Sequence, residues 1–246
     1  ADRFVDAFGP SDYIQALRQR VDGAGPIGSG SPLSVYVHIP FCESLCYYCA
    51  CNKVVTKHHE RAAEYLDALE REIGLHVERL GPGKAVSQLH FGGGTPTFLS
   101  DEELTRLMNA LRRAFRIAPG AETSIEVDPR TVDAGRLAHL ARLGFNRLSF
   151  GVQDFDPAVQ QAVHRVQSRE SVAALMETAR GLGFESSNVD LIFGLPRQTP
   201  ESLQRTIQQV AELRPERIAL YAYAHLPARF KPQRRIDASA LPPVAD

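Results

Sequence analysis

Short apolar runs alternate along the chain with longer segments in which apolar residues recur at helical spacing. Six runs have the length and composition of buried strands, at residues 35–39, 86–91, 124–127, 147–150, 188–193 and 217–220. The clearest helical segments lie between them, at residues 66–80, 104–115 and 203–213. Strand–helix alternation with crossovers of this length predicts a parallel sheet. Six steps are too few for a closed eight-stranded barrel. We therefore predict an α/β fold, an open partial (β/α)6 barrel of the TIM type.

Local signals mark the starts of two of these helices. Ser100 and Glu103 have the spacing of a capping box. Thr199 followed by Pro200 is typical of an N-cap with proline at the first helical position. In parallel sheets of this kind, chemistry collects at the C-terminal ends of the strands. We therefore searched for functional residues directly after each apolar run.

The chain divides into three regions. Residues 1–34 contain one short helical segment, at 11–20, and a linker at 23–32 that is rich in glycine, proline and serine. Residues 35–225 hold the six strand–helix steps. A basic segment follows at 226–246, with no further element behind it.

Composition narrows the classes of partner. The 28 basic and 29 acidic residues give a net charge of -1, so no global field attracts nucleic acid or an acidic membrane. No apolar run approaches the roughly 20 residues that span a bilayer, and the first residues, which include Asp2, Arg3 and Asp6, do not form a signal-peptide core. We expect a soluble, cytoplasmic protein without membrane or nucleic-acid partners.

All four cysteines lie between residues 42 and 51, directly after the first predicted strand. Their order is Cys42-x3-Cys46-x2-Cys49-x-Cys51. A disulfide is disfavoured in a reducing compartment, and a structural zinc site more often joins two separated cysteine pairs, although it stays an alternative. Three thiolates on one loop can instead hold three irons of a [4Fe–4S] cluster and leave the fourth open to chelate S-adenosylmethionine.

Other polar or glycine-rich positions follow the strands. Gly92-Gly93-Gly94 comes after the second strand and permits a ligand to approach the backbone, although a tight turn alone would use the same residues. Glu126 interrupts the third strand, where a carboxylate needs a ligand or an ion pair with an arginine. Further donors and acceptors lie after or within the later strands, each of which could alternatively be a solvated rim residue or a helix cap: Gln153, Asp154, Arg165 and Asp190.

The cysteine spacing, with Tyr48 before the third cysteine, resembles the radical S-adenosylmethionine superfamily. Within it, five segments make the chain similar to the oxygen-independent coproporphyrinogen III oxidase family: residues 36–42, 51–53, 92–97, 151–155 and 223–227. Haem-chaperone relatives share most of these motifs but carry phenylalanine where this chain has Cys51. The resemblance therefore favours the oxidase, with a haem-delivering chaperone as the alternative.

The resemblance implies oxidative decarboxylation of two propionates of coproporphyrinogen III to vinyl groups, which yields protoporphyrinogen IX for haem synthesis. It implies a [4Fe–4S] cluster on Cys42, Cys46 and Cys49 but not on Cys51, whose alternative interpretation is a small, buried, apolar residue near the cluster. It also implies two S-adenosylmethionine molecules. Tyr36, Gly93 and Glu126 would contact the first. The second would be surrounded by Tyr48, Gly94, Thr95, Gln153, Arg165, Asp190 and Ala224.

The resemblance has further implications. We expect a monomer that receives electrons from a flavodoxin or a ferredoxin. Members of the family continue with a C-terminal domain that this chain lacks, so the activity of the chain alone is in question. The basic cluster that ends the chain could attract the substrate carboxylates or be only a solvated tail: Arg229, Lys231, Arg234 and Arg235.

Overall fold

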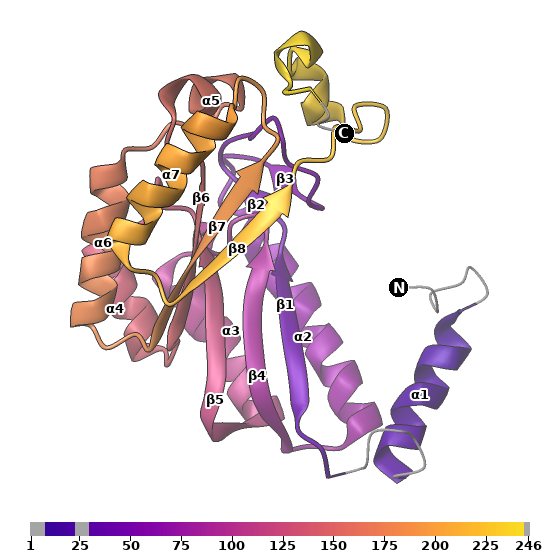
Figure 1. Cartoon of the computed structure of the whole chain (residues 1–246). Helices are drawn as coiled ribbons and strands as arrows, with labels where there is room; N and C mark the ends of the chain where they lie inside the picture. The colour runs from indigo at the N-terminus through magenta and orange to yellow at the C-terminus, as the bar shows by residue number, and fades with distance from the viewer. Residues whose placement is uncertain (1–7, 23–29, 244–246) are drawn as a thin grey trace. The chain divides into compact units, whose positions relative to one another are not determined.

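Six strands form one sheet in a computed structural model that describes residues 8–22 and 30–243 (Figure 1). Their order in the sheet follows their order in the chain: β1 (Leu33–Ile39), β4 (Lys84–Gly93), β5 (Phe115–Val127), β6 (Arg147–Gln153), β7 (Ser186–Phe193) and β8 (Arg217–Ala222). The pairs β5–β6, β6–β7 and β7–β8 are parallel. Each predicted strand is therefore present.

Among the described residues, one helix precedes the first strand and the others connect strands. The helices are α1 (Pro10–Asp22), α2 (Arg61–Leu80), α3 (Asp101–Ala114), α4 (Ala134–Arg142), α5 (Pro157–Ala162), α6 (Arg169–Gly181) and α7 (Pro200–Leu213). Among the described residues, no helix is long and apolar enough to cross a membrane. The described part of the chain also contains 3-10 turns at η1 (Pro96–Phe98), η2 (Lys231–Arg235) and η3 (Ala238–Ala240). The predicted helix at 11–20 is confirmed as α1, whereas most of the predicted linker at 23–32 lies outside the described residues.

The described residues group into two compact units. The first contains the described parts of residues 1–35, 60–89 and 102–121, and the second those of residues 36–59, 90–101 and 122–246. In the first unit, Arg106 of α3 donates from Nε to Oε1 of Glu70 on α2 at 2.9 Å. The second unit carries the C-terminal ends of all six strands, where the functional residues were expected.

Strand alternation builds the core of the second unit. Along β6, Leu148, Phe150 and Val152 are buried, while the residues between them are half-buried. Figure 1 shows α4, α6 and α7 along one face of β6–β8. Because successive strand residues point to opposite faces, the residues between the buried ones face the other side. One face of the sheet thus packs in the core, and the half-buried residues of the other face can contribute to a binding site.

The N-cap predicted for the last helix is confirmed. The Thr199 hydroxyl accepts a hydrogen bond from the Ser202 N–H at 3.1 Å, and the Ser202 hydroxyl accepts one from the Thr199 N–H at 2.9 Å. These reciprocal bonds satisfy two N–H groups that the helix itself leaves without partners. The capping box at Ser100 and Glu103 stays a prediction.

Two features differ from the sequence-based expectation. Phe115 starts β5, whereas the periodicity placed it at the end of a helix, and β5 begins nine residues before the predicted run at 124–127. The extension contains Pro119 and Gly120, residues that normally interrupt strands and therefore hid it. A short parallel pair, β2 (Phe41–Cys42) and β3 (Val54–Val55), was also not predicted, because two-residue strands leave no periodic pattern.

Candidate functional site

A cavity of about 450 Å³ lies at the C-terminal ends of the strands of the second unit. It is lined by every residue predicted to bind the cluster or S-adenosylmethionine except Tyr36: Cys42, Cys46, Tyr48, Cys49, Gly93, Gly94, Thr95, Glu126, Gln153, Arg165, Asp190 and Ala224. Asp154, a further polar candidate, is 1% exposed, accepts hydrogen bonds from Gln198 and Thr206 and lies outside the cavity. Tyr36 lies outside the cavity lining and contacts two histidines. Its ring stacks on His90 and its hydroxyl lies 3.1 Å from Nδ1 of His38. Segments separated by most of the chain therefore meet in one place, as the strand-end argument predicted.

Contacts from distant segments hold the cysteine loop. The Tyr47 N–H donates to the Val163 carbonyl at 2.9 Å, and Nδ1 of His164 lies 2.9 Å from the Leu45 carbonyl oxygen. Nζ of Lys53 donates to the carbonyl of Cys49 at 3.1 Å. The loop itself has little regular secondary structure, so these bonds satisfy backbone groups that no helix or sheet pairs.

The cysteine thiols differ in environment. Cys42 and Cys46 are buried, Cys49 is half-buried and Cys51 is exposed. A hydrogen bond with the Cys51 thiol, more than any other cause, lowers the pKa of Cys49 to about 6, although burial opposes this. The same bond, with burial, raises the pKa of Cys51. The hydrogen bond therefore favours the thiolate at Cys49 and the protonated thiol at Cys51.

Burial dominates at Cys42, whose pKa is raised although the Thr95 hydroxyl donates to its Sγ at 3.5 Å. Among the described residues, no three His, Cys, Asp or Glu side chains are grouped closely enough to hold a single metal ion. In a [4Fe–4S] cluster each thiolate binds its own iron, so the cysteines need not converge on one point. Three cysteines on one loop at the cavity wall fit that donor set.

The glycine turn after β4 packs directly on the strand that leads to the first cysteine. The Gly94 N–H donates to the Ile39 carbonyl and the Thr95 N–H to the Phe41 carbonyl, both at 2.8 Å. A Cβ atom at Gly94 would lie 2.7 Å from the carbonyl oxygens of Phe41 and Pro40. Gly93 has a φ of 122°, a conformation that residues with side chains rarely adopt. Close backbone packing therefore requires these glycines whether or not a ligand approaches them.

Glu126 points to the same turn. Its Oε2 accepts a hydrogen bond from the Gly93 N–H at 3.1 Å, and its Oε1 lies 3.4 Å from Nε2 of His90. Among the ion pairs of the described residues, the basic partner of Glu126 is His90 and not an arginine. The side chain is 39% exposed, so much of the carboxylate is open to the cavity. The predicted ion pair with an arginine is therefore wrong, and binding of a ligand by Glu126 stays a prediction.

A polar wall faces Glu126 across β6 and β7. Asp190 accepts hydrogen bonds from Ser149 at 2.9 Å and from Asn188 at 2.7 Å. Burial raises the pKa of Asp190, although those two bonds favour its carboxylate. Gln153 has a φ of 69°, next to a shift in the β6–β7 register. A bulge of this kind redirects a side chain at the end of a strand.

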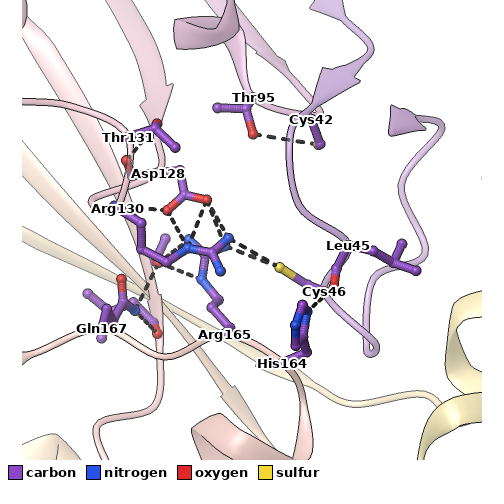
Figure 2. A network of polar contacts seen from close by, with 12 residues as sticks. Cys42, Leu45, Cys46, Thr95, Asp128, Arg130, Thr131, His164, Arg165 and Gln167 are labelled. Carbon is purple, nitrogen blue, oxygen red and sulfur yellow. Dashed lines mark hydrogen bonds and ion pairs between the residues drawn. The ribbon is translucent and has the colours of Figure 1, made fainter. Parts of the chain in front are cut away.

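Sequence reasoning missed two parts of the site. Asp128 and Arg130, directly after β5, form an ion pair at 2.7 Å and line the cavity (Figure 2). Their place after a strand was a usable signal. Gln233, which is 1% exposed, donates from Nε2 to the carbonyls of Tyr48 and Ala224, both at 3.0 Å. No local pattern singles out Gln233, because its partner Tyr48 lies far away in the sequence.

The basic cluster near the chain end lies beside the same loop. Arg234 donates from Nε to the Pro227 carbonyl at 2.9 Å. The Arg235 guanidinium lies 5.4 Å from the ring centroid of Tyr47. Phe230 and Gln233, from the same segment, line the cavity. The segment is therefore part of the cavity wall and not a detached tail.

Comparisons with known proteins identify the class. Residues 36–210 match the family described as the radical SAM superfamily. The match covers most of the chain, so this protein belongs to that superfamily. Membership implies a [4Fe–4S] cluster and S-adenosylmethionine as cofactors.

The curated relatives narrow the comparison. The chain is 50% identical over 239 residues to the oxygen-independent coproporphyrinogen III oxidase of Escherichia coli (strain K12), covering 97% of this chain and 50% of the relative. It is 54% identical over 239 residues to the enzyme of the same name from Salmonella typhimurium, again covering 97% and 50%. The chain thus spans about half the length of the curated relatives it matches.

Solved structures agree with the fold. The coproporphyrinogen III oxidase of Escherichia coli, described as a radical SAM enzyme, matches with a TM-score of 0.90 and 50% identity, over 99% of this chain and 54% of that one. A radical S-adenosylmethionine methyltransferase from Kitasatospora setae matches with a TM-score of 0.55 at 14% identity, which shows the fold alone. The predicted fold class, an open partial barrel of parallel strands, is confirmed.

The glycine packing generates a first test, with Gly94→Ala compared to Gly74→Ala. Gly94→Ala places a methyl group against two backbone carbonyls that cannot turn away, and we expect it to cost about 1–3 kcal/mol of stability. It should also lower the iron retained after reconstitution, since the displaced strand carries Cys42.

Gly74, within α2, has nothing within 4 Å of its Cβ position. Gly74→Ala should leave iron content unchanged and stability equal or higher. Melting curves and iron analysis check both, and equal behaviour of the two variants would refute the packing argument.

Proposed function

We propose that this chain carries the radical-generating site of an oxygen-independent coproporphyrinogen III oxidase. The enzyme would oxidatively decarboxylate two propionates of coproporphyrinogen III to vinyl groups and give protoporphyrinogen IX. One observation carries the proposal: all but one of the residues expected to bind the cluster and S-adenosylmethionine line a single cavity, in a chain 50% identical to enzymes of that name. The electron donor, the monomeric state and the cytoplasmic location stay predictions.

In this proposal, Cys42, Cys46 and Cys49 bind three irons of the cluster. Their place on one loop at the cavity wall supports the assignment, because three thiolates on one loop can each bind an iron. Cys51 donates to Cys49 and stays outside the ligand set. The bound cofactors supply one-electron chemistry, and the chain supplies position and charge.

The other cavity residues would bind S-adenosylmethionine. Gly93 and Glu126, with Tyr36 behind them, would contact a molecule at the cluster. The polar wall around Asp190, together with Gln153 and Arg165, would surround a second one. Acceptors such as the Asp190 carboxylate suit ribose hydroxyls, and the Arg165 guanidinium suits a carboxylate. Groups suited to ribose hydroxyls and to a carboxylate therefore lie in one cavity, which supports two binding places for S-adenosylmethionine. The shape of the cavity does not by itself assign each residue to one of the two molecules.

The basic segment would serve the porphyrinogen. Arg234 and Arg235 belong to a turn that contributes Phe230 and Gln233 to the cavity wall. Cations at the mouth of a cavity attract anionic substrates and raise their local concentration. Coproporphyrinogen III bears four carboxylates, so the positive charge of Arg234 and Arg235 would attract it.

The activity is tested with the full-length protein, reconstituted with iron and sulfide under anaerobic conditions. Coproporphyrinogen III, S-adenosylmethionine and a reductant are added, and released carbon dioxide and vinyl product are measured. We expect both products. In a parallel sample, haem replaces the substrate. Stable haem binding without turnover would reject the oxidase and support the chaperone alternative.

The ligand assignment predicts a distinct pattern for four serine variants. Cys42→Ser, Cys46→Ser and Cys49→Ser should each lose most of the reconstituted iron, because a hydroxyl replaces a cluster thiolate. Cys51→Ser should keep it, since this residue is only a hydrogen-bond partner. Iron and sulfide analysis with the visible spectrum decides the matter. Retention of the full cluster by Cys46→Ser, or its loss from Cys51→Ser, would contradict the assignment.

Glu126→Ala should weaken S-adenosylmethionine binding about tenfold or more, because hydrogen bonds to charged groups contribute about 1.5–3 kcal/mol. Its melting temperature should change little, since the carboxylate leaves few internal partners behind. Glu122, on the same strand, is paired with Arg147 and lies outside the cavity. The control Glu122→Ala should show the reverse, with lower stability and unchanged affinity. Calorimetric titration of the cluster-loaded proteins beside melting curves separates the two outcomes.

A further inference from the structure

Cys46 has cationic neighbours. Nη1 of Arg165 donates to Cys46 Sγ at 3.4 Å, and Nη2 of Arg130 donates to the same sulfur at 3.6 Å. Figure 2 shows both guanidinium groups directed at this thiol. Guanidinium groups stay protonated in proteins, so both donors carry full positive charge.

Asp128 fixes the two guanidinium groups in place. Its Oδ2 accepts from Nη2 of Arg130 at 2.7 Å and from Nη1 of Arg165 at 3.2 Å. Its Oδ1 accepts from Nε of Arg130 at 3.0 Å, so that pair is held by two parallel bonds. Such bidentate pairs add geometric specificity to their charge. Neither arginine can leave Cys46 without giving up part of this arrangement.

The network is largely removed from water. The side chains of Arg165 and Asp128 are 8% and 9% exposed, and that of Arg130 is 19% exposed. Solvent therefore screens their charges weakly, and the interaction with a nearby anion is stronger than on a surface. Two arginines against one aspartate leave a surplus of one positive charge beside Cys46.

The other two proposed ligands have no arginine among their described contacts. The hydrogen bond to Cys42 comes from the neutral Thr95 hydroxyl. Cys49 bonds the Cys51 thiol, and Lys53 bonds the Cys49 side chain and donates to the Cys49 carbonyl at 3.1 Å. The arginine contacts are thus concentrated on Cys46, while a single lysine supplies the positive charge beside Cys49. This asymmetry is not needed for ligation, which requires only the thiolates.

We propose that Arg130, held by Asp128, raises the reduction potential of the cluster through its contact with Cys46. A reduced cluster carries one more negative charge than the oxidised one. Hydrogen bonds to the sulfurs and nearby positive charge therefore favour reduction. Arg130 is a positioning residue whose effect reaches the irons through a ligand. The inference rests on the proposed ligation by Cys46.

The consequence concerns electron entry. The electron comes from an external one-electron donor, and a higher potential lets a donor of given strength reduce a larger share of the clusters. Arg165 makes a similar contact, but we also expect it to bind S-adenosylmethionine. Its substitution would mix two effects, so Arg130 is the residue to change.

The test measures the potential of the reconstituted cluster without S-adenosylmethionine, by mediated redox titration followed by paramagnetic resonance. Arg130→Gln should reduce the ratio of reduced to oxidised cluster about tenfold at a fixed poise, which is a shift of about 59 mV to lower potential for one electron. Arg130→Lys keeps the charge and should lie between Arg130→Gln and the unchanged protein. The control Arg205→Gln removes an arginine that is 63% exposed and paired with Asp156, and should leave the potential unchanged.

The outcomes separate this inference from the proposed function. If the unchanged protein binds no iron and sulfide, the cluster assignment fails first. If all variants hold the cluster and Arg130→Gln has the same reduction potential as Arg205→Gln, only the inference is overturned. Loss of iron from a well-folded Arg130→Gln protein would also overturn it, because the residue would then hold the cluster instead of tuning it. If Arg130→Gln does not fold, Arg130→Lys decides, and a potential equal to that of the unchanged protein would overturn the proposal.

Discussion

The site depends on the extended segment at residues 39–42, whose four carbonyls are all bonded, alternately on two sides. Ile39 and Phe41 accept from the N–H groups of Gly94 and Thr95, while Pro40 and Cys42 accept from those of Val54 and Thr56. The glycine turn lies on one side and the return strand of the cysteine loop on the other. Cys42 is therefore fixed from both directions. This is possible only because no side chain at position 94 separates the two backbones.

Beyond that segment, the loop is held by residues that have no secondary structure in common with it. A buried Gln233 bonds the Tyr48 carbonyl, and the backbone at Val163 receives the Tyr47 N–H. An irregular loop with its polar groups satisfied in this way can keep three thiols in place before any metal arrives. The same long-range contacts bring charge to the loop, which is how Arg130 and Arg165 reach Cys46. Loop position and loop electrostatics thus come from the same neighbours.

The contrast between local patterns and long-range contacts explains what the sequence could predict. The strands, the cysteine spacing and the residues at the strand ends are local patterns, and the structure brings almost all of the predicted residues into one cavity. The first half of β5 was hidden because Pro119 and Gly120 are typical of turns. Gln233 and the Arg130–Cys46 contact join positions far apart in sequence, so no local pattern could reveal them. For the same reason, the sequence could not show which basic residue pairs with Glu126. The structure shows that it is His90.

The alternation of the strands also determines where this site can change. Glu126 lies between Ile125 and Val127, which are 0% and 3% exposed, and Asp190 is flanked by core residues in the same way. Adjacent residues on one strand therefore have opposite constraints, since core positions must keep their volume and cavity positions need only suit the ligand. A substitution at a cavity position removes contacts to the ligand with little loss of packing. The chemistry of the cavity can consequently diverge among relatives while the sheet behind it stays the same.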